Sequence, residues 1–120
     1  MTPEGKVKNA VRKVLSDHQC YWFFPVQNGM GRTGIPDVIG CIPTVITPDM
    51  VGKTFGQFIA VETKSFGKKS LSHASRNQQR ELQAIAEKGG LAILADRPET
   101  VEEAIRGRPL VQEIVYRRDT

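Results

Sequence analysis

Residues 57–64 read QFIAVETK, an apolar stretch of strand length that ends in a glutamate and a lysine. Residues two apart in a strand point to the same face, so Glu62 and Lys64 are expected to lie together while Thr63 points away. Charged side chains at the end of a buried strand cost free energy unless they are paired or bind a metal. This stretch therefore predicts a sheet with a polar site at one end.

The segment after this strand predicts a helix and a second buried strand. Ser75 can cap the helix, and the paired glycines at 89 and 90 end it. Residues 91–95 read LAILA, a wholly apolar strand that is typical of a sheet covered on both faces. The apolar face of the helix is formed by Leu82, Ile85 and Ala86.

The rest of the chain adds further elements of both kinds. A first helix is expected from Thr2 and Pro3 to about Asp17, followed by strands at 21–24 and 37–42. The connection 43–56 suggests a hairpin with some strand around 44–47. A C-terminal helix (98–106), lined by Val101, Ala104 and Ile105, and a strand (110–116) are also expected. The order helix, three strands, helix, strand predicts an α/β fold with a mixed central sheet flanked by helices, in a single domain (1–120).

Composition sets the class of protein only broadly. Lys and Arg number 17 against 13 Asp and Glu, for a net charge of +4 and a pI near 9.3, which suits a polyanionic partner without requiring one. The sequence has no apolar run long enough to cross a bilayer and begins without a signal-peptide pattern. Its two cysteines fit no pairing pattern. The expected location is the cytoplasm, or the host cytoplasm if the gene is viral.

A second carboxylate, Asp37, opens the strand predicted at 37–42. A salt bridge to Lys64 would account for Asp37 or for Glu62 alone. Two carboxylates, however, would share this single lysine. A hard divalent cation resolves this imbalance, because Mg²⁺ prefers carboxylate oxygens, water and phosphate. Asp37, Glu62 and the backbone carbonyl of Thr63 are the candidate ligands, with Lys64 beside a bound water or a scissile phosphate.

These residues resemble the PD-(D/E)xK nuclease superfamily, and more closely its VRR-NUC branch, the virus-type replication-repair nucleases. The resemblance runs from about Glu4 to Ala95. It implies a restriction-endonuclease-like core and an Mg²⁺- or Mn²⁺-dependent endodeoxyribonuclease, with Asp37, Glu62 and Lys64 as catalytic residues. The matching motifs, in chain order, are Gly34-Ile35-Pro36-Asp37, Glu62-Thr63-Lys64, Gly67-Lys68-Lys69, a glutamine at the start of a helix, Leu82 and Gly89-Gly90.

Two further site positions follow from the resemblance. Gln78 and Gln79 compete for the functional glutamine, and the spacing to Leu82 and the paired glycines favours Gln78 as the fourth catalytic residue. Glu4 matches a first-helix glutamate that can join the metal ligands in this family. Its alternative role is to stabilise the N-terminus of the helix through the macrodipole.

The resemblance implies DNA as partner, with four-way (Holliday) junctions the favoured substrate and a homodimer expected because resolution needs two cuts. Alternatives of the same class are a flap, single-strand or duplex nuclease in replication and repair. A non-catalytic DNA-binding module on the same fold is the alternative of another class. Phosphate contacts are expected from Arg32, Lys68, Lys69, Arg76 and Arg80.

Overall fold

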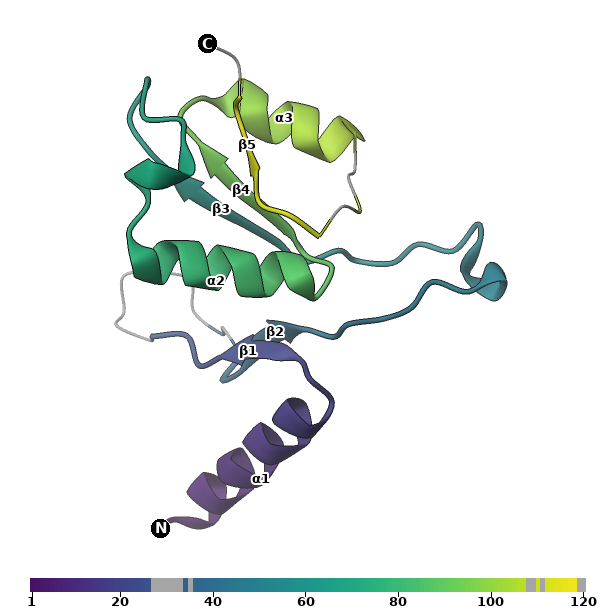
Figure 1. Cartoon of the computed structure of the whole chain (residues 1–120). Helices are drawn as coiled ribbons and strands as arrows, with labels where there is room; N and C mark the ends of the chain where they lie inside the picture. Colours follow the sequence, from purple (N-terminus) through teal and green to yellow (C-terminus); the bar gives the residue numbers. More distant parts are fainter. Residues whose placement is uncertain (27–33, 35, 108–109, 111, 119–120) are drawn as a thin grey trace. The chain divides into compact units, whose positions relative to one another are not determined.

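The described residues form both α-helices and β-strands, so the predicted α/β class is confirmed (Figure 1). The computed structural model describes residues 1–26, 34, 36–107, 110 and 112–118. The chain divides into a first unit, Met1–Pro43, and a second unit, Thr44–Thr120. No helix in the described ranges has the length and apolar character needed to cross a membrane.

The first unit consists of one helix and a pair of antiparallel strands. Helix α1 (Pro3–Asp17) begins as predicted, because the Thr2 hydroxyl accepts the backbone N–H of Gly5 at 3.0 Å. Strand β1 (Tyr21–Phe23) pairs antiparallel with β2 (Ile39–Cys41).

Strand β2 is shorter and less buried than the predicted strand 37–42. Asp37 precedes it by two residues and is exposed, and within the strand Ile39 is only half-buried. Phe23 pairs with Ile39, so two residues further along the same register Pro25 would face Asp37. Proline has no N–H to donate, which accounts for the end of the ladder there.

The second unit contains a three-stranded parallel sheet in the order β3-β4-β5. Its strands are β3 (Ile59–Thr63), β4 (Leu91–Ala95) and β5 (Val115–Tyr116). Helix α2 (Arg76–Glu87) connects β3 to β4, and α3 (Pro98–Gly107) precedes β5. Two short 3₁₀ helices, η1 (Pro48–Met50) and η2 (Leu71–His73), lie in the connections.

Three expectations for this unit are wrong in detail. Residues 44–47 form no strand, and Val45 is 83% exposed in a segment bounded by Pro43 and Pro48. The predicted strand 110–116 contracts to the two residues of β5. Ile105, expected on the buried face of the last helix, is exposed, while Thr100 is buried instead. The apolar pattern of a short segment does not predict these details, because contacts with segments distant in the sequence determine which side chains are buried.

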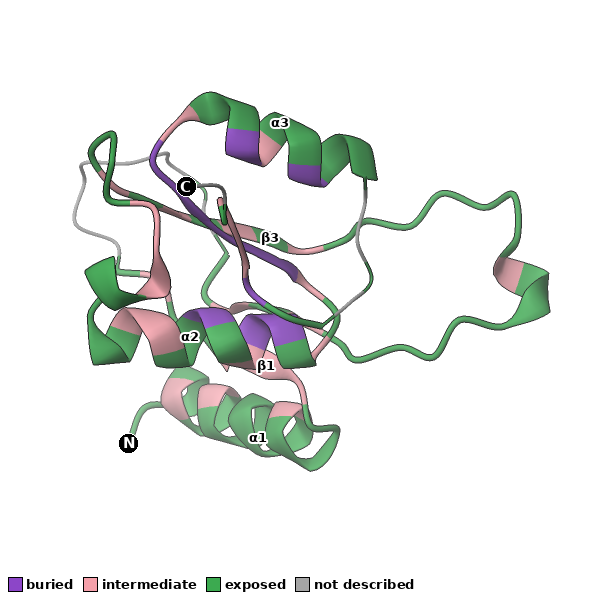
Figure 2. Cartoon of the chain, turned by 45° about the horizontal axis from the view of Figure 1, so that its top comes forward, coloured by how far each residue is buried: buried purple, intermediate pink, exposed green. Residues whose placement is uncertain are grey.

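The core of the second unit lies on β4, all five residues of which are buried (Figure 2). Leu91, Ile93 and Ala95 share one face of the strand and pack with Ala104 of α3. Helix α2 contacts both β4 and β3 and buries Leu82, Ile85 and Ala86, as predicted. In Figure 1, β4 lies between the two helices, so the sheet is covered on both faces at its centre. The expected mixed central sheet is not seen among the described residues: the antiparallel pair β1–β2 and the parallel strands β3, β4 and β5 form two separate sheets.

Candidate active site

Glu62 and Lys64 lie on one face at the end of β3, as the alternation of a strand predicts. Lys64 Nζ lies 3.7 Å from Glu62 Oε2, and the two side chains are 21% and 30% exposed. The backbone N–H of Lys64 donates to the Ala95 carbonyl at 2.9 Å, which extends the pairing with β4. The charged pair is thus held at the rigid end of a sheet while its ends remain open to solvent.

Gln78 joins this pair from the first turn of α2. Lys64 Nζ donates to Gln78 Oε1 at 3.1 Å, in a partly buried contact. The same oxygen accepts the N–H of Ser75 at 2.9 Å, and the Ser75 hydroxyl accepts the N–H of Gln78 at 3.1 Å. This reciprocal capping box fixes the start of α2, so the cap that begins the helix also orients the acceptor for Lys64.

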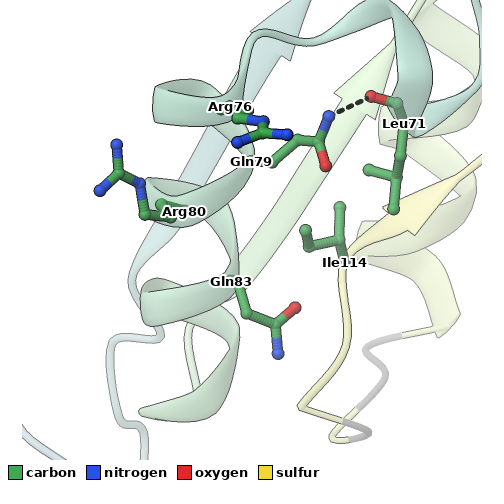
Figure 3. Close-up of a pocket in the computed structure, with 6 residues that line it drawn as sticks. All are labelled: Leu71, Arg76, Gln79, Arg80, Gln83 and Ile114. Atoms are coloured by element: carbon green, nitrogen blue, oxygen red, sulfur yellow. Dashed lines mark hydrogen bonds between the residues drawn. The ribbon is translucent and has the colours of Figure 1, made fainter.

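The neighbouring Gln79 points elsewhere. Its Nε2 donates to the carbonyls of Leu71 and Ala74, at 3.0 and 2.9 Å, and so ties η2 to the helix. Gln79 lines a pocket of about 580 Å³ together with other residues of α2, with Leu71 and with Ile114 (Figure 3). Of the two glutamines that the sequence left in competition, the structure brings Gln78 to Lys64.

A buried ion pair that was not predicted from the sequence, between Asp96 and Arg117, lies at the same end of the sheet. Asp96 follows β4 directly and is 6% exposed. Its carboxylate accepts Nε of Arg117 at 3.2 Å and the N–H of Gly67 at 2.8 Å. The Arg117 guanidinium lies 5.6 Å from the centre of the Phe66 ring. Asp96 therefore fixes the loop that leaves Lys64. The signal available in the sequence was a carboxylate placed directly after a wholly apolar strand.

The hydrogen bond from Arg117 is the main cause of a lowered pKa at Asp96. The pKa falls from the ordinary 3.8 to about 2, with the Gly67 N–H acting in the same direction and burial opposing both. Asp96 is thus a carboxylate throughout the physiological pH range. Its negative charge is matched by Arg117, which makes the pair a structural element beside the Glu62–Lys64 pair.

The other predicted residues are distributed over both units. Asp37 and Glu4 belong to the first unit, where Asp37 is exposed and Glu4 lies in the first turn of α1. Thr63 is exposed at the end of β3. In the second unit, Lys68 and Lys69 lie in the loop after β3, and Arg76 and Arg80 are exposed on α2. Arg32 lies outside the described residues.

Glu62 offers the type of ligand that a hard divalent cation prefers. Its carboxylate is half-buried and lies beside Lys64, which also donates to Gln78. Over the described ranges, His, Cys, Asp and Glu side chains do not gather in a group of three that could hold a metal. A single carboxylate fits Mg²⁺, which keeps several waters and commonly takes only one or two protein carboxylates.

Comparison with known proteins gives no match: no family model, no curated protein and no solved structure resembles the chain significantly. The side chains of the site therefore indicate its chemistry. An ammonium group fixed by a carboxylate and an amide oxygen at the open end of a sheet can contact an anion or a water. A phosphate group fits such a site better than an apolar ligand does.

Proposed function

We propose that the protein is a metal-dependent, structure-selective DNA endonuclease that hydrolyses phosphodiester bonds, with four-way junctions as the favoured substrate. The observation that carries this proposal is the convergence of Glu62, Lys64 and Gln78 from two elements at the end of the sheet. These residues come from motifs that resemble those of VRR-NUC nucleases in chain order. The resemblance also supplies the proposed restriction-endonuclease-like core.

Lys64 acts on the scissile phosphate in this proposal. Its Nζ is oriented by Gln78 Oε1 and by Glu62, so the ammonium need not be ordered when substrate binds. A water oxygen forms a bond to phosphorus as the bond to the leaving sugar oxygen breaks. Lys64 positions or deprotonates this water and stabilises the negative charge that develops on the phosphate oxygens. The proton of the water passes to Lys64 or to solvent, and the leaving sugar oxygen takes a proton from solvent. No covalent bond to the enzyme forms.

The proposed metal ligands are Asp37, Glu62 and the Thr63 carbonyl, with Glu4 as a further candidate. The Mg²⁺ or Mn²⁺ that they would hold supplies a more acidic water and offsets charge on the phosphate. Glu62 contributes a carboxylate whose orientation is set by β3 and Lys64. Its role as a ligand predicts that Glu62→Gln raises the metal concentration needed for cleavage.

Basic residues beside the site are proposed to contact the DNA backbone. The loop after β3 carries Lys68 and Lys69, and Gly67 of this loop is held by Asp96. Arg76 and Arg80 lie one turn apart on α2 and line the pocket in Figure 3. Arg32 is proposed on its sequence position alone. A homodimer is proposed because the resolution of a junction requires two symmetric cuts.

The test is a cleavage assay on four DNAs of shared sequence: four-way junction, flap, linear duplex and single strand. Each is incubated with Mg²⁺, Mn²⁺ or EDTA, and Lys64→Ala and Asp37→Ala, purified identically, exclude a contaminating nuclease. Paired, metal-dependent cuts at the junction support the proposal. Cuts confined to flaps, duplex or single strands retain the nuclease and change its substrate. Binding without cleavage in either metal favours a non-catalytic DNA-binding module, in which Gln78 is only a helix cap.

A further inference from the structure

A second basic pocket, the α3 pocket, lies between α3 and β5. The pocket lined by Arg76 and Arg80 is the α2 pocket. The volume of the α3 pocket is about 590 Å³, and its lining includes three arginines and one glutamate. Arg117 is paired with the buried Asp96, so the α3 pocket keeps an excess of one positive charge. None of its residues was among those expected to contact DNA. The polar residues that line it are Arg97, Arg117, Arg118, Tyr116, Thr100 and Glu103.

Two of these arginines are held in place by their neighbours. Arg117 donates to the buried Asp96, which fixes the guanidinium at the end of β5. Arg118 lies over the Tyr116 ring, 4.5 Å from its centre. Because part of the side-chain entropy is already lost, an anion entering this pocket meets cations that need little further ordering. Guanidinium groups suit phosphate oxygens in particular, since their donors form a planar fork.

This pocket and the α2 pocket open on opposite faces of the sheet. The α2 pocket is lined by Arg76 and Arg80 of α2, and the α3 pocket by Thr100 and Glu103 of α3. Helices α2 and α3 flank β4 from its two sides (Figure 2). Two positively charged pockets are thus separated by the full thickness of the sheet.

We propose that the α3 pocket binds a second segment of phosphodiester backbone, so that this unit contacts two arms of a branched DNA. This inference rests on the proposed function, in that it takes DNA as the ligand. A straight duplex lying against the α2 face has no backbone segment on the α3 face. Two arms that diverge at a branch can reach both faces. The pocket is therefore a determinant of selectivity for branched over linear DNA.

Two substitutions change the charge of the pocket in opposite directions. Arg118 and Glu103 are both exposed, so Arg118→Gln and Glu103→Gln should leave the fold intact. Lys53→Gln removes a charge from an exposed position outside both pockets and serves as the matched control. Circular dichroism and thermal unfolding establish that all three variants fold as the wild type does.

The experiment measures binding of a four-way junction and of one linear arm by fluorescence anisotropy in EDTA, over a range of salt. Arg118→Gln should weaken junction binding about three- to tenfold. It should also reduce the slope of log K against log salt by about one for the junction alone. Glu103→Gln should strengthen junction binding, and Lys53→Gln should change neither DNA.

Equal changes for junction and linear arm, or no change for either, would overturn the inference, as would an effect of Lys53→Gln as large as that of Arg118→Gln. Stronger competition by inorganic phosphate than by the junction would show a small-anion site instead and would also overturn it. Because cleavage is not measured, the result is separable from the proposed function. Junction-selective binding that depends on Arg118, without cleavage in Mg²⁺, would defeat the nuclease assignment and leave this inference standing.

Discussion

Lys64, at the end of β3, donates a hydrogen bond of 3.1 Å to Gln78 in the first turn of α2. The two residues are 14 positions apart, and the contact exists because the capping box of the helix turns the Gln78 amide oxygen toward the strand end. A local feature of helix initiation thus sets the position of a charged side chain in the candidate site. This coupling makes the roles of Gln78 in folding and in catalysis experimentally separable.

Gln78→Glu and Gln78→Ala should separate these roles. Glutamate preserves the capping box, since its carboxylate can also accept the Ser75 N–H, whereas alanine removes this half of it. Gln78→Ala should lower the free energy of unfolding by about 0.3–1.5 kcal/mol, and Gln78→Glu should not. Both variants should slow cleavage. Alanine removes the amide oxygen that orients Lys64, and glutamate places a second carboxylate against Lys64. Urea unfolding and single-turnover cleavage measure the two effects, and wild-type cleavage by Gln78→Glu would reduce the residue to a helix cap.

Asp96 should make the free energy of unfolding depend on pH in the acid range. Its pKa is lowered to about 2 by Arg117, so the folded form holds its proton less tightly than the unfolded chain, for which the ordinary value is 3.8. The stabilisation is therefore fully present above about pH 4 and is lost as the pH falls toward 2.

The measurement is the thermal unfolding temperature between pH 2 and pH 7 for wild type, Asp96→Asn and Asp17→Asn. Asp17 forms an exposed pair with Lys13 and serves as the control. Asp96→Asn should be less stable at neutral pH and should lose less stability than wild type between pH 4 and pH 2. Parallel curves for wild type and Asp96→Asn in this interval would contradict the role assigned to Asp96.

Ile93 should be the most sensitive position of the core, because it is fully buried in the central strand and packs with residues of α3. Ile93→Ala should lower the free energy of unfolding by about 2–5 kcal/mol, whereas Ile93→Val should cost about 0.5–1.5 kcal/mol. Chemical denaturation with an unchanged slope against denaturant would measure the difference. Equal losses of free energy of unfolding for the two variants would contradict this prediction. They would show that neighbouring side chains fill the space that the smaller residue leaves.

The sequence predicts the parts of the fold whose signals are local. Helix α2 follows from the Ser75 cap, the apolar face and the paired glycines, where Gly89 takes a positive φ of 91° and the Gly90 N–H bonds back to Ile85. Strand β4 follows from five consecutive apolar residues. The shared face of Glu62 and Lys64 follows from strand alternation alone.

Features that depend on distant residues could not be predicted in this way. The residues 44–47, expected as a strand, include apolar side chains but form no strand in the structure. The apolar pattern of a short segment does not reveal whether a partner strand exists. The Asp96–Arg117 pair joins positions 21 apart, and no spacing rule connects them. The spacing to Leu82 and the paired glycines favours Gln78 over Gln79, but the hydrogen bond from Lys64 to Gln78 depends on side-chain directions that spacing does not give.

The most direct test of the account is the cleavage rate of Lys64→Ala under single-turnover conditions, on the preferred DNA in Mg²⁺, beside wild type and Lys53→Ala. Lys53 is exposed and is not among the proposed site residues, so its substitution controls for the loss of one positive charge. The account predicts that Lys64→Ala slows cleavage by at least about 100-fold while binding and unfolding temperature are retained. Cleavage by Lys64→Ala at the wild-type rate would contradict it.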